Sequence, residues 1–104
     1  MKTYKVVIDY TAKQDMLDIR RYISNTLKEP VAAKRIYNSI KTAILTLNHT
    51  PMRQAIVSEE PYASLGVRTS PVENYTAFYI VDEAAKQVNV FRVMYNRRVW
   101  QNLL

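Results

Sequence analysis

The stretch VNVFRVMY at residues 88–95 is apolar at almost every position. A strand with one face in water alternates apolar and polar side chains, whereas a strand covered on both faces is apolar nearly throughout. The stretch therefore predicts a central strand of a sheet. Two further strands are expected at residues 65–70 and 75–81, and residues 82–87 would link the last two strands as a hairpin.

The N-terminal half predicts one strand and two helices. Residues 4–10 alternate β-branched or aromatic side chains with polar ones, which is typical of a strand. Thr11 begins a capping-box pattern, so a helix is expected to start there and to end near Lys28. Pro30 suits the first turn of a second helix, whose apolar stripe continues to Leu47. The two helices should form an antiparallel hairpin.

These elements define the expected fold class. The order is β-α-α-β-β-β, followed by a short C-terminal helical tail in which Trp100, Leu103 and Leu104 share one face. The simplest way to bury both helix stripes is an α+β fold, with the N-terminal helical hairpin packed on one face of a small, mainly antiparallel sheet. A chain of 104 residues fits one domain spanning residues 1–104.

Composition excludes several classes of protein. The chain has no cysteine, one glycine (Gly66) and one histidine (His49). Disulfide scaffolds, thiolate metal sites, glycine-rich phosphate loops and clustered histidine ligands are therefore excluded, and no cofactor or metal is expected. No apolar run is long enough to span a membrane and the start has no signal-peptide core, so we expect a cytoplasmic protein without membrane association.

The charge balance points to an anionic partner. Fifteen Lys and Arg against nine Asp and Glu give a net charge of +6 and a pI near 9.7. Such a field attracts nucleic acid, acidic protein segments or anionic membranes. Lys34, Arg35 and Lys41 lie outside the apolar stripe of the second helix and could contact a polyanion. A charge row on an exposed helix face is, however, most often only solvated.

The alternation of side chains along a strand predicts which face of the sheet each arginine occupies. If Val67 and Phe91 point toward the helices, Arg68 and Arg92 point away from them. The two arginines are therefore expected to share the helix-free face. The alternative is that Arg92 is an ion-pair partner within the sheet.

The densest functional cluster follows at the end of the last strand. It contains two aromatic side chains and two guanidinium groups within six residues: Tyr95, Arg97, Arg98 and Trp100. Guanidinium groups bind phosphate oxygens in pairs and aromatic rings stack on unpaired bases, as in single-stranded RNA recognition. The structural alternative is that Trp100 anchors the core.

Three segments carry a family resemblance: residues 65–68 (LGVR), residues 78–83 (FYIVDE) and, above all, residues 91–100 (FRVMYNRRVW). Together with the helix-pair opening they resemble the RelE/ParE superfamily of toxins from bacterial type II toxin–antitoxin modules, also called plasmid stabilisation proteins. The resemblance runs from residue 4 to residue 104. It implies a microbial-ribonuclease-like sheet with two N-terminal helices, and a cognate antitoxin with an acidic, flexible segment that wraps the toxin.

The RelE-like branch of the superfamily cleaves messenger RNA in the ribosome without a metal. Carried over, the resemblance implies Arg68 as the sheet arginine, Arg97 and Arg98 as the basic pair and Tyr95 as the proton-handling group. Trp100 stands where many nucleases have a tyrosine, and an indole cannot serve as acid or base. The loop before Arg68 also lacks the lysines of that branch.

The ParE-like branch blocks DNA gyrase and needs no catalytic residues, so only a RelE-like member would be an enzyme. Its last strand also carries an Arg-Val, a ring residue and a basic pair, which this sequence has, and the helical hairpin would be a candidate binding surface. We favour ParE-like gyrase inhibition slightly over RelE-like mRNA cleavage by an endoribonuclease; a non-toxic RNA-binding module is the third hypothesis. The candidate target-binding residues are Arg92, Trp100, Lys34, Arg35 and Lys41.

Overall fold

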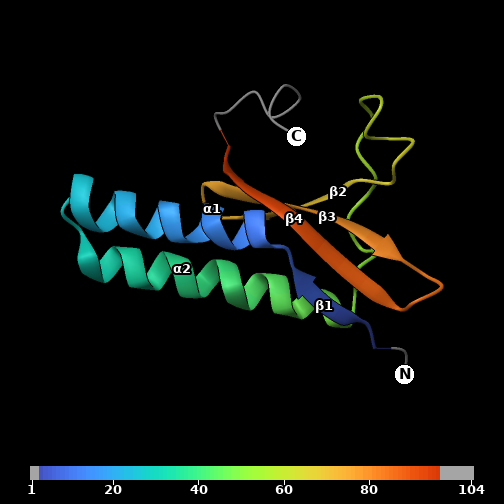
Figure 1. Cartoon of the computed structure of the whole chain (residues 1–104), viewed down its shortest axis with the longest axis horizontal. Helices are drawn as coiled ribbons and strands as arrows, with labels where there is room; N and C mark the ends of the chain where they lie inside the picture. The colour runs from blue at the N-terminus through green and yellow to red at the C-terminus, as the bar shows by residue number, and fades with distance from the viewer. Residues whose placement is uncertain (1–2, 97–104) are drawn as a thin grey trace.

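The computed structural model describes residues 3–96, and its elements follow the predicted order (Figure 1). These elements are β1 (Lys5–Ile8), α1 (Tyr10–Arg21), the π-helical turn η1 (Tyr22–Thr26), α2 (Pro30–Leu45), the 3-10 turn η2 (Thr46–Asn48), β2 (Arg68–Val72), β3 (Tyr75–Asp82) and β4 (Gln87–Tyr95). The α+β architecture with an N-terminal helical hairpin is confirmed. The expected tail at residues 100–104 lies outside the described residues.

The four strands form one mixed sheet in the order β1-β4-β3-β2. β2, β3 and β4 pair antiparallel, whereas β1 pairs parallel with β4, with Lys5 opposite Gln87 and Ile8 opposite Val90. β4 therefore has a strand on each side along its first half. This agrees with the central position that its apolar sequence predicts.

The first helix begins two residues earlier than the capping-box pattern, with Thr11 as its N-cap, predicts. Its N-cap is Asp9, with no side-chain cap bond, and Thr11 already lies inside α1. The reason is the junction with the sheet: the Asp9 N–H donates to the carbonyl of Val90 at 2.9 Å, while the Asp9 carbonyl accepts from Lys13 at 2.9 Å. Asp9 thus ends the strand and starts the helix, which leaves no room for a separate cap.

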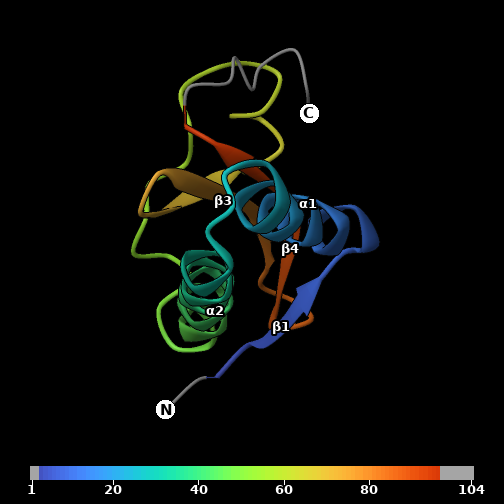
Figure 2. The same ribbon diagram turned by 90° about the vertical axis from the view of Figure 1, so that its left-hand side faces the viewer.

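The turn between the helices is short, as predicted. η1 continues α1 to Thr26, and α2 starts at Pro30, where the missing N–H costs no helical hydrogen bond. Lys28 adopts a left-handed backbone with φ of 55° between them. The two helices consequently run antiparallel side by side (Figures 1 and 2).

The helical hairpin buries its apolar stripes on one face of the sheet. Met16 of α1 and Ile40 and Ile44 of α2 pack with Tyr79 and Val90 of the sheet in one buried cluster. All five side chains are at most 3% exposed. This cluster is the main core, and it explains the spacing of three and four residues in both helix sequences.

The other face of the sheet is covered by the loop of residues 49–67. Val67, Phe78 and Met94 form a second buried cluster, with Tyr62 of the loop and Phe91 packed against it. The expectation that Val67 and Phe91 point toward the helices is therefore wrong. The face away from the helices is not a bare surface but a second, smaller core.

A β-bulge explains the error on β4. Phe78 pairs with Arg92 and Tyr79 pairs with Val90, so Phe91 has no partner opposite it. A bulge inserts one residue into a strand and changes which face the following side chains occupy. Strict alternation along residues 88–95 therefore fails at Phe91.

The second strand is also displaced from its predicted range. It spans Arg68–Val72 instead of residues 65–70, and Pro71 lies within it rather than in the following turn. β2 is an edge strand, where a residue without an N–H is tolerated. The loop enters β2 through Gly66, whose φ of 78° is favourable only for glycine.

Within residues 3–96, none of the helices combines the length and the apolar character that crossing a bilayer requires.

Tyr79 ties the loop to the core. Its ring is fully buried, and its hydroxyl donates to the carbonyl of Pro51 at 2.7 Å. Burial raises the pKa of Tyr79, and the positive charge of Arg68 partly opposes this shift. The folded protein therefore requires a neutral phenol at this position.

We predict that the free energy of unfolding declines above about pH 10, where tyrosine ionises in the unfolded chain but Tyr79 stays protonated in the folded chain. The contribution is fully present below that pH and is lost as the pH rises through the higher folded-state pKa. Tyr79→Phe should cost about 1 kcal/mol at pH 7, because a hydrogen bond is lost, and should flatten the decline. Urea unfolding between pH 7 and pH 11 measures both effects.

Tyr10→Phe is the matched control, because the Tyr10 side chain is 76% exposed and should leave both values unchanged. A Tyr79→Phe variant that keeps the full decline above pH 10 would contradict the assignment.

Candidate functional site

Arg92 makes a two-point ion pair with α1. Its Nε donates to Asp15 Oδ2 at 2.8 Å, and its second terminal nitrogen donates to Oδ1 at 3.1 Å. The backbone N–H of Val93 donates to the same Oδ2 at 3.0 Å. The structure thus gives Arg92 the ion-pair role that the sequence left as an alternative.

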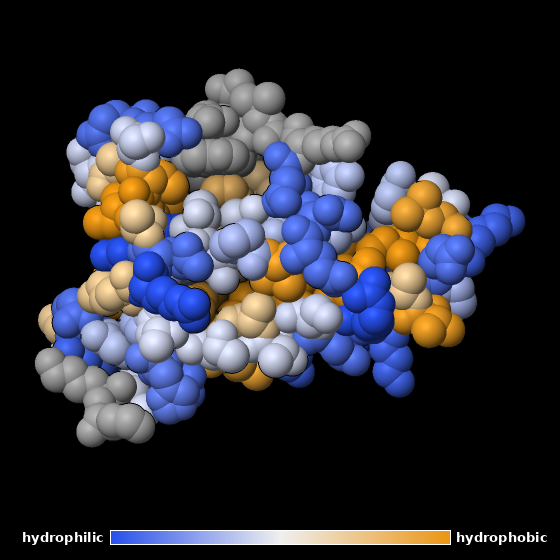
Figure 3. Space-filling view, turned by 180° about the vertical axis from the view of Figure 1, so that it is seen from behind, coloured by the Kyte–Doolittle hydropathy of each residue, from blue (hydrophilic) through white to orange (hydrophobic). Residues whose placement is uncertain are grey.

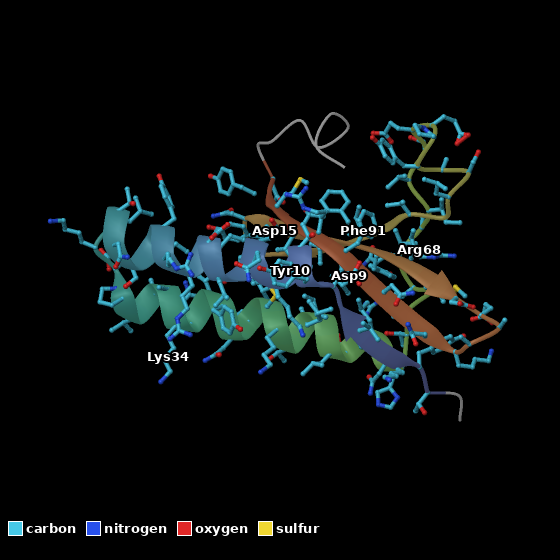
Figure 4. All side chains as sticks on the ribbon, in the orientation of Figure 1. Asp9, Tyr10, Asp15, Lys34, Arg68 and Phe91 are labelled. Atoms are coloured by element: carbon cyan, nitrogen blue, oxygen red, sulfur yellow. The ribbon has the colours of Figure 1, made fainter. Side chains whose placement is uncertain are left out.

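Asp15 accepts a backbone hydrogen bond that a neighbouring strand would otherwise accept from β4. β1 pairs with β4 only as far as Val90, so the second half of β4 has an open edge on that side. α1 follows β1 directly and runs along this edge, where the Asp15 carboxylate accepts the Val93 N–H (Figure 4). The Asp15 side chain is 15% exposed and that of Arg92 25% exposed. Because the pair is mostly shielded from water, it fixes α1 against β4.

Arg68 lies on β2, away from Arg92, and its guanidinium binds backbone carbonyls of the loop. It pairs with Tyr79, whose side chain belongs to the helix-side core, so Arg68 is not on the helix-free face as expected. One terminal nitrogen of its guanidinium donates to the carbonyl of Gln54 and approaches that of Met52 at 3.5 Å. Figure 4 shows Arg68 well separated from Asp15 along the sheet. The two sheet arginines are therefore not brought together.

The three candidate cations of the second helix are all exposed on α2. Arg35 pairs with Glu73 in the β2–β3 turn at 2.8 Å, whereas Lys34 extends away from the body of the molecule (Figure 4). Lys34 and Arg35 line a shallow surface hollow together with Pro30, Val31 and Asn38. Lys41 lies two turns further along the helix.

The helical hairpin carries most of the excess positive charge. Residues 10–48 contain seven basic and three acidic side chains, whereas residues 49–96 contain four and five. Exposed apolar side chains lie among these charges, with Val31 83% and Leu27 52% exposed near the turn between the helices. Seen from behind, apolar surface emerges at this end of the hairpin and again at the loop (Figure 3). Mixed basic and apolar surface of this kind suits contact with another protein.

The end of β4 presents an aromatic side chain. Tyr95 is 39% exposed and packs edge to face on Tyr75, with 5.5 Å between ring centroids and 63° between ring planes. The following residue, Asn96, donates its N–H to the carbonyl of Asn74 at 2.8 Å and accepts from the Thr76 hydroxyl at 2.6 Å. Arg97, Arg98 and Trp100 lie outside the described residues.

Tyr22 is a surface residue that the sequence analysis did not single out. It is 54% exposed at the start of η1. Burial raises the pKa of Tyr75, and the nearby Tyr95 phenol, the Glu73 carboxylate and the Tyr22 phenol raise it further. Three tyrosines from three elements therefore lie near one another. The sequence signal that could have identified Tyr22 as a surface residue is its position at the last turn of the helix, where the apolar stripe of the helix leaves the core.

Within residues 3–96, no three histidine, aspartate or glutamate side chains gather closely enough to hold a metal ion.

Comparison with known proteins assigns the family. The family model "ParE toxin of type II toxin-antitoxin system, parDE" matches residues 6–100. The chain belongs to the ParE toxin family. No match was found among curated protein sequences.

Two solved structures share the fold of this ParE-family chain. The chromosomal ParDE toxin–antitoxin system from P. aeruginosa superposes with a TM-score of 0.73 at 20% identity, covering 91% of this chain and 98% of that chain. The RelBE2 toxin–antitoxin complex from Mycobacterium tuberculosis gives a TM-score of 0.69 at 19% identity, with coverage of 89% and 98%. At these identities the similarity concerns the fold.

We predict that Asp15→Ala lowers the free energy of unfolding by about 2 to 3 kcal/mol, because Arg92 and the Val93 N–H both lose a charged acceptor. Asp15→Asn should cost less, since its amide oxygen still accepts the N–H. Asp18→Ala on the same helix is the control, because its pair with Arg21 is exposed and should contribute about 0.5 kcal/mol or less. Equal losses for Asp15→Ala and Asp18→Ala in chemical denaturation would contradict the role of Asp15.

Proposed function

We propose that this ParE-type toxin arrests growth by binding DNA gyrase and inhibiting it. In this proposal it is a stoichiometric inhibitor rather than an enzyme, and it requires neither metal nor cofactor. Gyrase acts on the chromosome, so the proposal implies a toxin that works in the cytoplasm.

The internal engagement of Arg68 and Arg92 carries this proposal. Metal-independent RNA cleavage needs cations around the scissile phosphate and a group that moves a proton. Arg68 donates to backbone carbonyls of the loop, and the charge of Arg92 is neutralised by Asp15. Arginines held in this way stabilise the fold, and this supports inhibition by binding over catalysis on the sheet.

The helical hairpin supplies the proposed contact surface for the target. Lys34, Arg35 and Lys41 are exposed on α2, within the part of the chain that carries the positive excess. A surface of one sign raises the rate of encounter with an anionic partner and orients it. Trp100 is proposed as a further contact because it follows β4 in the sequence.

We also propose that an acidic antitoxin neutralises the toxin. Both similar solved structures are toxin–antitoxin systems, which supports a partner of this kind. The net charge of +6 favours an acidic segment in that partner.

RelE-like mRNA cleavage is the second candidate function. It is favoured by the exposed position of Tyr95 at the end of β4, directly before Arg97 and Arg98 in the sequence. The fold similarity to the RelBE2 complex is compatible with either activity. In this alternative, Tyr95 would handle the proton and the two arginines would stabilise the charge on the phosphate.

We predict that the purified chain inhibits supercoiling by gyrase and leaves translated messages intact. Lys34→Glu should weaken inhibition about 3- to 10-fold, since a reversed charge at a contact opposes association. Lys5→Glu changes the net charge equally but lies on β1, and should stay within about 2-fold of the wild type. A supercoiling assay and primer extension on host messages provide the two measurements.

The opposite outcome is equally specific. Ribosome-dependent transcript cleavage that is abolished by Arg97→Ala or Arg98→Ala, without gyrase inhibition, would replace the proposal with the nuclease.

A further inference from the structure

One end of the molecule gathers three tyrosines that the proposed gyrase contact does not use. We call Tyr22, Tyr75 and Tyr95 the tyrosine surface; they come from η1, β3 and β4 respectively. Figure 2 looks onto this end, where the end of α1 is seen beside the β2–β3 turn and below the end of β4.

The contacts of α1 explain how Tyr22 reaches the two strand tyrosines. Asp15 is held against the Val93 N–H, and Tyr22 follows Asp15 by seven residues, which is two helical turns and so the same face of the helix. Helical side chains lean toward the N-terminus of their helix. By these rules Tyr22 lies on the face of α1 that meets β4, and its ring leans toward the end of that strand, where Tyr95 packs on Tyr75.

The surface has the composition of a protein interface. Tyr22 and Tyr95 are 54% and 39% exposed, although each is a large ring that burial would favour. Two exposed ion pairs involve residues close to these tyrosines in the sequence: Arg21 pairs with Asp18 on α1, and Arg35 pairs with Glu73 in the β2–β3 turn. An aromatic centre with a charged rim is the arrangement in which tyrosine side chains contribute most to binding.

We propose that the tyrosine surface is the docking site for an acidic, amphipathic segment of the antitoxin. The inference rests on the proposed neutralisation by an antitoxin and specifies where that partner binds. Apolar side chains of the segment cover the rings, and its carboxylates meet Arg21 and Arg35. Each of these guanidinium groups contacts its own carboxylate through one terminal nitrogen, and a guanidinium has five N–H donors, so it can also bind a carboxylate of the partner.

A protein segment fits this surface better than RNA does. Tyr75 and Tyr95 meet edge to face, so they do not form a flat platform on which successive bases could stack.

The antitoxin is favoured over the toxin's target because of position and charge. The end of α1 and the turn to α2 carry Arg20, Arg21 and Lys28, which the proposed gyrase contact does not use, and these charges favour an acidic partner. Tyr95 lies two residues before Arg97 in the sequence. A partner seated on Tyr95 therefore binds the chain directly before the basic pair in the sequence.

The test measures the affinity of purified toxin variants for the purified acidic protein encoded by the adjacent gene. Tyr22→Ala should weaken binding about 10-fold or more, because a hot-spot tyrosine is removed. Tyr22→Phe keeps the ring and should stay within about 3-fold of the wild type. Tyr10→Ala, at an exposed tyrosine near the start of α1, should have no effect. Tyr22→Ala without the antitoxin should still arrest growth.

Hydrogen exchange of the wild-type complex tests the surface without any substitution. Antitoxin binding should protect amides in residues 20–24, 73–76 and 93–96, and not those of the β3–β4 turn at residues 83–86. Unchanged affinity of Tyr22→Ala together with no protection at these three segments overturns the proposal. So does a Tyr22→Ala variant that binds the antitoxin normally but loses growth arrest, or loses affinity for a single-stranded ribo-oligonucleotide. Gyrase inhibition by the wild type tests the proposed function separately.

Discussion

The structure depends on how the open edge of the second half of β4 obtains hydrogen-bond partners. β1 stops at Ile8 and leaves the backbone beyond Val90 without a strand, and an unpaired edge beside a core is costly and prone to aggregation. α1 resolves this through one carboxylate, Asp15, which binds the Val93 N–H and Arg92 together. The same contact sets the position of the whole helical hairpin, since α2 follows α1 after a short turn. A single half-buried acid thus connects the two layers.

This arrangement separates structural cations from exposed ones. Arg92 and Arg68, the two arginines of the sheet, are each used to hold a neighbouring segment, the first on α1 and the second on the loop. The cations in contact with water lie mainly on the helical hairpin. In the proposed function, recognition by this ParE-family toxin therefore uses its helical layer and the end of β4 rather than the face of the sheet. The tyrosines at that end join both regions.

The sequence predicted what depends on local patterns. The two helix stripes, Pro30 at the start of α2 and the interior position of β4 all follow from periodicity and composition. The sequence-based prediction failed where the structure is determined by contacts between residues far apart in the sequence. Phe91 changes face because of a bulge defined by pairing with β3, and the partner of Arg92 is 77 positions away in the sequence. The loop of residues 49–67 has no periodicity, so its coverage of Phe78 and Met94 was not foreseen either.

The parallel pairing of β1 with β4 has a consequence for biosynthesis. The first strand emerges from the ribosome early, yet its partner, residues 87–90, is among the last parts of the described chain to be made. Until then the helices can form locally, but their apolar faces have no completed sheet to cover them. Contacts between such distant segments slow folding and extend the time for which a nascent chain exposes apolar surface. The helices therefore gain a completed sheet only after residues 87–90 have been synthesised, and their apolar faces are accessible to other proteins until then.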